Sequence, residues 1–98
     1  MSALLYYENN QQTIFNDSYS GSGLLEAMGL NWWVWFESFM DKEERTLLPE
    51  KAKEVAIELE KNKDKLKDKH PYYMDNLKYF IKFLKVAAKK GITIECSI

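Results

Sequence analysis

The sequence predicts a small α+β domain, in which a short antiparallel or mixed sheet packs on three helices in the order ββαααβ. Three observations favour this fold. Residues Ile92–Ile98 alternate apolar and polar without interruption, which is typical of a half-buried strand. Two apolar stretches near the N-terminus flank a turn, and helical spacing of apolar residues dominates the chain between these ends. With 98 residues, we expect a single domain covering 1–98.

The N-terminal segment predicts a β-hairpin. Ala3–Tyr7 is apolar and aromatic, Glu8–Gln11 supplies turn-forming residues, and Gln12–Asn16 has the pattern of the returning strand. Together with the C-terminal strand, this hairpin would form the sheet. The small residues of 17–23 then predict a loop that leads into the first helix.

This loop contains a candidate anion-binding sequence, Gly21-Ser22-Gly23. Free backbone N–H groups at the start of a helix attract anions, so the loop could hold one. It lacks the lysine and the full spacing of a phosphate-binding P-loop. The alternative, which we favour, is a tight turn that joins strand to helix.

The first helix is predicted over Leu24–Met40. Its expected core face consists of Leu25, Met28, Trp32, Trp35, Phe36 and Phe39, which recur at helical spacings. Gly29 weakens the middle, and Asn31 could cap a new start, so a break there is the alternative. Trp33 and Met40 fall on another side. They are either buried by a second layer or form a patch that binds a partner.

The second helix is predicted to begin near Pro49, whose fixed φ suits the first helical position. The third extends from Pro71 to Gly91, since a glycine just beyond the last turn commonly ends a helix. Besides its core face, the third helix carries a second apolar face of Tyr72, Tyr79, Phe83 and Val86. Small monomers rarely expose such a patch, so it predicts a homodimer. The competing interpretation is that the sheet or the second helix covers this face within one chain.

A stripe of lysines, spaced four, three and four residues apart, separates the two apolar faces: Lys78, Lys82, Lys85 and Lys89. Such a stripe is either a solvated flank or a surface that binds phosphates or an acidic protein. The net charge is −5 over residues 1–41 and +4 over residues 42–98. Nucleic-acid binding is not expected, because the overall charge is −1 and the chain has a single arginine.

Several functional classes are excluded by composition. Cys96 is the only cysteine and His70 the only histidine, so the chain cannot build an internal disulfide, a cysteine-based metal site, a histidine-based triad or a multi-histidine metal site. We therefore expect no enzyme, no cofactor and no metal. No apolar run approaches the ~20 residues of a membrane span, and no secretory signal is visible. A reducing cytoplasm is the expected location.

Three segments resemble a group of small bacterial and phage proteins: Asn31-Trp-Trp-Val-Trp, the helix that starts at Glu50, and Phe80 onward into Gly91-Ile-Thr-Ile. These proteins share a Trp-rich helix, a helix patterned on alanine and leucine, and a final helix that runs into a Gly-led strand. The resemblance covers residues 31–95. It implies no activity, but it favours an accessory protein of a mobile element or of a toxin–immunity cassette.

These observations predict a non-enzymatic binding protein that neutralises a bacterial protein by stoichiometric contact, as a phage anti-defence or immunity protein does. Trp33, Met40 and the lysine stripe are its expected partner-binding residues. The alternative is a protein that sequesters a nucleotide, with aromatic rings stacking on the base and lysines holding the phosphates. A structural subunit of a larger assembly is a third hypothesis.

Overall fold

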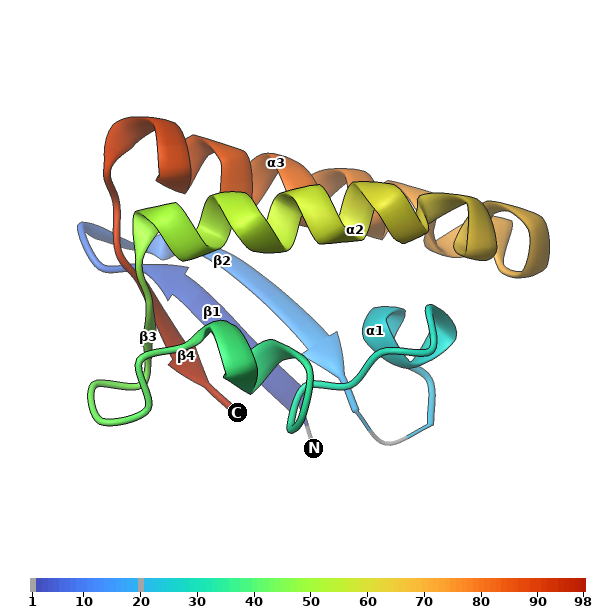
Figure 1. The fold of residues 1–98 in the computed structure, drawn as a ribbon, viewed down its shortest axis with the longest axis horizontal. Helices are drawn as coiled ribbons and strands as arrows, with labels where there is room; N and C mark the ends of the chain where they lie inside the picture. The colour runs from blue at the N-terminus through green and yellow to red at the C-terminus, as the bar shows by residue number, and fades with distance from the viewer. Residues whose placement is uncertain (1, 20) are drawn as a thin grey trace.

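A computed structural model of the chain describes residues 2–19 and 21–98, and within them four strands form one antiparallel sheet (Figure 1). The strands are β1 (Ser2–Tyr7), β2 (Asn10–Ser18), β3 (Thr46–Leu47) and β4 (Ile94–Ser97), in the spatial order β2-β1-β4-β3. The C-terminal strand β4 lies between β1 and β3, where it pairs Cys96 with Leu5 and Ile94 with Leu47. The predicted α+β class, the hairpin and the C-terminal strand are confirmed.

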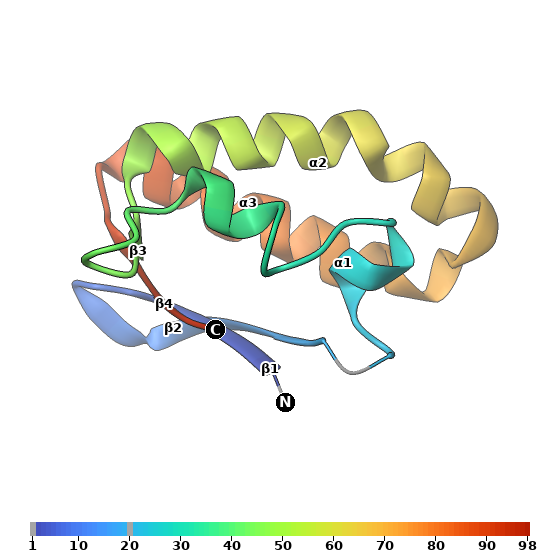
Figure 2. The ribbon, with the colours of Figure 1, turned by 60° about the horizontal axis from the view of Figure 1, so that its bottom comes forward.

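Two long helices cover one face of this sheet. The helical elements are α1 (Leu24–Ala27), the 3₁₀ turn η1 (Phe36–Phe39), α2 (Pro49–Lys69), the 3₁₀ turn η2 (Pro71–Tyr73) and α3 (Met74–Lys90). Only a short turn at His70 separates α2 from η2 and α3, so the two long helices form an antiparallel pair. Figure 2 shows both on the same side of the sheet, and none of the described helices covers its other face.

The core lies between the helix pair and the inward side of the sheet. Because side chains alternate along a strand, β1 directs Ala3, Leu5 and Tyr7 toward the helices, and all three are buried. Phe15 of β2 stacks on Phe80 of α3, with ring centroids 4.1 Å apart. The two strands of the N-terminal hairpin, β1 and β2, therefore pack directly against α3.

The segment 24–40 does not form the single helix that we predicted. Helix α1 ends at Ala27, and Gly29 takes a left-handed conformation with φ of 74°, which breaks the helix. Asn31 then starts a new turn, because its side-chain oxygen accepts a hydrogen bond from the Val34 N–H at 2.6 Å. The alternative of a break near Gly29 is therefore the observed one.

Both predicted ends of the helix pair are confirmed. Pro49 is the first residue of α2, and Gly91 follows α3 in a left-handed conformation with φ of 68°. The N–H of Ile92 donates to the carbonyl of Ala87 at 2.9 Å, which turns the chain out of α3 toward β4. Pro49 thus marks the start of α2, and Gly91 marks the end of α3.

Candidate functional site

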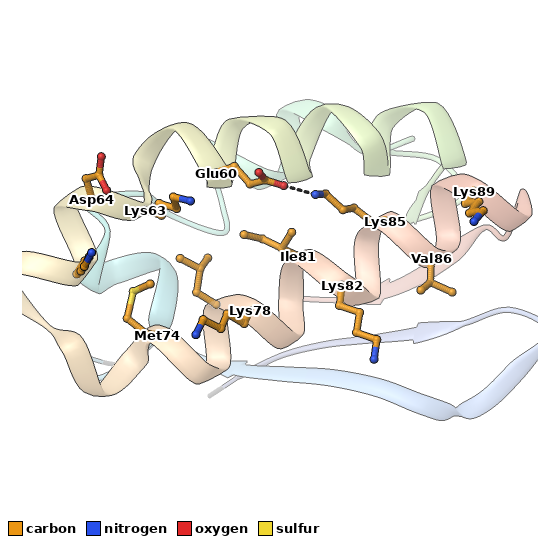
Figure 3. A pocket seen from close by; sticks show the side chains of 12 residues that line it. Glu60, Lys63, Asp64, Met74, Lys78, Ile81, Lys82, Lys85, Val86 and Lys89 are labelled. Atoms are coloured by element: carbon orange, nitrogen blue, oxygen red, sulfur yellow. Dashed lines mark ion pairs between the residues drawn. The ribbon is translucent and has the colours of Figure 1, made fainter.

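An open groove of about 600 Å³ lies between α2 and α3, and all of its lining residues belong to these two helices (Figure 3). Helix α2 contributes Glu60, Lys63, Asp64 and Lys67, and α3 contributes Met74, Leu77, Lys78, Ile81, Lys82, Lys85, Val86 and Lys89. The short connection through η2 keeps the two helices side by side, so the groove follows directly from their pairing. We refer to it as the lysine groove.

The lysine groove combines an apolar floor with a positively charged rim. Leu77 is fully buried at its base, while Met74 and Ile81 are partly buried and pack against the core. Figure 3 shows the Ile81 side chain pointing toward α2 and the Lys82 side chain extending to the side away from α2. Six lysines and two carboxylates line the groove, so its charge is strongly positive although the whole chain is slightly acidic.

One ion pair crosses the lysine groove, between Glu60 of α2 and Lys85 of α3 (Figure 3). In the described part of the chain, no carboxylate lies within salt-bridge distance of the other five lysines of the rim. The groove can therefore offer most of its positive charge to a ligand without breaking an internal ion pair.

A second hollow of about 400 Å³ extends the same surface along the helix pair. It is lined by Lys53, Ala56, Ile57, Lys85, Ala88 and Lys89. Lys85 and Lys89 line both hollows, so the two are adjacent. Ile57 is 45% exposed, which adds an apolar side chain from α2 to this end of the surface.

The structure brings the predicted lysine stripe together with residues that the sequence interpretation missed. Lys78, Lys82, Lys85 and Lys89 all line the lysine groove. Lys63 and Lys67 of α2 face them across it. The signal for these two was their four-residue spacing, which in a charged run such as 61–69 is equally typical of a solvated face.

Trp33 and Met40, which were predicted as a possible partner-binding patch, do not come together on one surface. Met40 is buried in the core, and because residues 24–40 do not form one helix, helical spacing does not place it beside Trp33. Trp33 is 48% exposed and makes an edge contact with Tyr19, with ring centroids 5.3 Å apart. Neither residue lines the lysine groove. Of the pair, only Trp33 is accessible to a partner.

Of the four residues of the predicted self-association face, the chain's own sheet buries Phe83, whereas Tyr72 is 72% exposed. Phe83 is 2% exposed and stacks on Tyr7, whose hydroxyl donates to the Phe83 carbonyl at 2.6 Å. Tyr79 remains about half exposed, but its hydroxyl donates to the Ile14 carbonyl at 2.7 Å. Phe83 therefore belongs to the core, as in the competing interpretation. A homodimer through α3 would have to use Tyr72, Tyr79 and Val86 without it.

The candidate anion loop is already occupied by carboxylates of the chain itself. The N–H groups of Gly21 and Gly23 donate to the Glu26 carboxylate at 3.1 and 3.4 Å. The Asp17 carboxylate accepts from the Leu24 and Leu25 N–H groups at 2.7 and 3.3 Å. The loop thus satisfies its own donors, as expected for a tight turn, and these N–H groups are not free for an external anion. Ser22 is exposed, and its carbonyl accepts from the Tyr73 hydroxyl.

The remaining side chains with reactive chemistry are dispersed or shielded. Among the described residues, histidine, cysteine, aspartate and glutamate do not gather in groups of three or more that could hold a metal ion. Cys96 is buried, and burial raises the pKa of its thiol to about 12. The thiol is therefore protonated at neutral pH and is a poor nucleophile. No helix in residues 2–19 and 21–98 is long and apolar enough to cross a membrane.

Comparison with protein-family models, curated proteins and solved structures finds no match for this chain. The resemblance of residues 31–95 to small bacterial and phage proteins accordingly stays a prediction from sequence pattern. The lysine groove combines a concave shape, an apolar floor and a positively charged rim.

Proposed function

We propose that this chain is a non-enzymatic binding protein that captures a partner protein through the lysine groove, in one-to-one stoichiometry, and so neutralises it. The observation that carries the proposal is the groove itself: an apolar floor of Met74, Leu77 and Ile81 beneath a rim with six lysines. Burial of apolar surface supplies affinity, and a charged rim supplies orientation and a fast encounter. A phage anti-defence or immunity protein acting in a bacterial cytoplasm would work in this way.

The composition of the groove favours a protein over a nucleotide. A nucleotide-sequestering site would place an aromatic ring where it can stack on the base, and the residues lining the lysine groove include none. They include no arginine either, the residue that recognises phosphate in bidentate geometry. Apolar side chains beneath lysines instead suit a surface that is itself amphipathic, as protein segments are.

Affinity capture with a matched pair of variants tests this function. The tagged protein is incubated with a bacterial lysate at low salt, alongside Lys78→Glu/Lys82→Glu, which reverses two charges of the rim. The control Lys61→Glu/Lys65→Glu makes the same charge change on exposed residues of α2 that do not line the groove. Circular dichroism and urea unfolding first establish that both variants fold like the wild type.

We expect the wild type and the control to retain the same protein in equimolar amount, and the groove variant to lose it. Added salt should weaken the capture, since a rim of exposed charges is screened beyond ~10 Å at about 0.1 M ionic strength. Retention by the groove variant as strong as by the wild type would contradict the proposal. So would a rise in melting temperature with free nucleotides that the groove variant abolishes.

A further inference from the structure

The shape of the lysine groove bears on what kind of segment can enter it. Both walls are helices, whose backbone N–H and C=O groups already bond within α2 and α3. An extended peptide on the apolar floor would find no backbone partners there, and its own buried polar groups would be unsatisfied at a cost of about 1–3 kcal/mol each. A helix satisfies its own backbone and avoids this cost. The walls therefore select a helical occupant.

The charges of the groove specify the surface of that helix. Lys78, Lys82 and Lys85 follow one another at intervals of four and three residues, the intervals that bring side chains to one side of a helix. Lys63 and Lys67 form a second pair of positive charges on the opposite wall. An occupant that lies along the groove would meet lysines on both sides and apolar residues beneath, so it needs an apolar stripe flanked by acidic residues.

We infer that the lysine groove binds an acidic amphipathic helix of the partner protein, laid along α2 and α3 as a third helix. The inference rests on the proposed function and specifies its partner. The floor from Met74 to Val86 is roughly 18 Å long at 1.5 Å per helical residue. A helix of about 12–15 residues covers it, with apolar residues at positions i, i+3 or i+4, and i+7.

Synthetic peptides of about 15 residues test the inference directly. The first carries leucines at i, i+4, i+7 and i+11 with glutamates beside them. The second has the same composition in scrambled order, so that no apolar stripe forms. The third keeps the stripe but replaces every glutamate by lysine. A fourth has the first sequence with a central proline, which breaks the helix. Dissociation constants are measured by fluorescence anisotropy against the full chain.

We expect the first peptide to bind at least about tenfold more tightly than each of the other three. The others lose either the glutamates that complement the lysines of the rim, or the apolar stripe that covers the floor. Lys78→Glu/Lys82→Glu should remove this preference, and Lys61→Glu/Lys65→Glu should keep it. Equal binding of the first, second and fourth peptides would overturn the inference, because a charged surface without shape selectivity would account for it.

Three other occupants have outcomes that separate them from the acidic helix. Groove-dependent binding to phosphatidylserine vesicles or to poly(U) RNA, tighter than to the first peptide, would overturn the inference in favour of a membrane or nucleic acid. Concentration-dependent dimerisation that the groove variant abolishes would overturn it in favour of a second copy. Groove-dependent capture of a lysate protein without any peptide preference would overturn the inference of a helical occupant but leave the proposed function intact. If neither lysate capture nor peptide preference depended on the groove, both the inference and the proposed function would be overturned.

Discussion

Replacing Asp17 by asparagine tests how the chain is held after strand β2. The Asp17 carboxylate is buried and accepts three hydrogen bonds, from the Leu24 N–H at 2.7 Å, the Leu25 N–H at 3.3 Å and the Trp32 indole N–H at 2.8 Å. Asparagine has nearly the same shape but presents one oxygen and one NH₂ group. Whichever way the amide turns, a donor then faces one of these donors.

The expected cost follows from the number and kind of bonds lost. A hydrogen bond to a charged acceptor contributes about 1.5–3 kcal/mol, and a buried donor left without a partner costs about 1–3 kcal/mol. The bond from Trp32 is short and buried, whereas the one from Leu25 is long and contributes less. We therefore expect Asp17→Asn to lower the free energy of unfolding by about 3 kcal/mol, a large share of the roughly 5–15 kcal/mol typical of a small domain.

Urea unfolding followed by circular dichroism measures this loss. Glu8→Gln, an exposed carboxylate in the hairpin turn, serves as the control and should change stability by less than about 0.5 kcal/mol. A double-mutant cycle with Trp32→Phe isolates the indole bond, for which we expect a coupling energy of about 1–2 kcal/mol. A loss below about 1 kcal/mol for Asp17→Asn, or strict additivity with Trp32→Phe, would refute the role assigned to this carboxylate.

Three further predictions concern the core, the thiol and the groove. Tyr7→Phe removes the buried bond to the Phe83 carbonyl but keeps the stacked ring, so it should cost about 1 kcal/mol in urea unfolding; no loss would show that the bond is dispensable. Because burial raises the pKa of the Cys96 thiol to about 12, only the unfolded chain releases this proton between pH 9 and 12, so the free energy of unfolding should fall as pH rises through that window. Cys96→Ala should make this fall less steep, and an unchanged dependence on pH would contradict the raised pKa. Glu60→Gln frees Lys85 from its ion pair and removes a negative charge, so the acidic amphipathic peptide should bind about two- to fivefold more tightly in anisotropy titrations, whereas weaker binding would mean that the pair shapes the groove.

The fold was predictable where local pattern and tertiary structure agree. Three local patterns predicted elements that the structure contains, because each reflects a local physical constraint. They are the alternation over Ile92–Ile98 for β4, Pro49 at the start of α2 and Gly91 after the end of α3. The prediction of one helix over 24–40 was wrong. Its apolar periodicity favours a helix, but Gly29 takes a left-handed conformation that ends α1. Strand β3 has only two residues, Thr46 and Leu47, which is too short for any periodicity to reveal.

Four of the six lysines that line the candidate site were predictable from the sequence. The stripe from Lys78 to Lys89 was visible because all its members lie on one helix. Lys63 and Lys67 were not, since their role depends on which face α2 turns toward α3, and that is decided by tertiary packing. For the same reason the sequence did not decide between interface and core for Phe83. The sheet that buries it is assembled from strands at both ends of the chain.

Site-specific photo-crosslinking shows whether a partner protein is bound in the lysine groove. A photoreactive amino acid is placed at Ile81 in the groove floor, and in a second preparation at Ile14, which is 43% exposed on strand β2. Each preparation is irradiated in bacterial lysate, and the adducts are resolved by mass. We expect one adduct of defined mass from Ile81 and none from Ile14. An adduct of defined mass from Ile14 with none from Ile81 would contradict it.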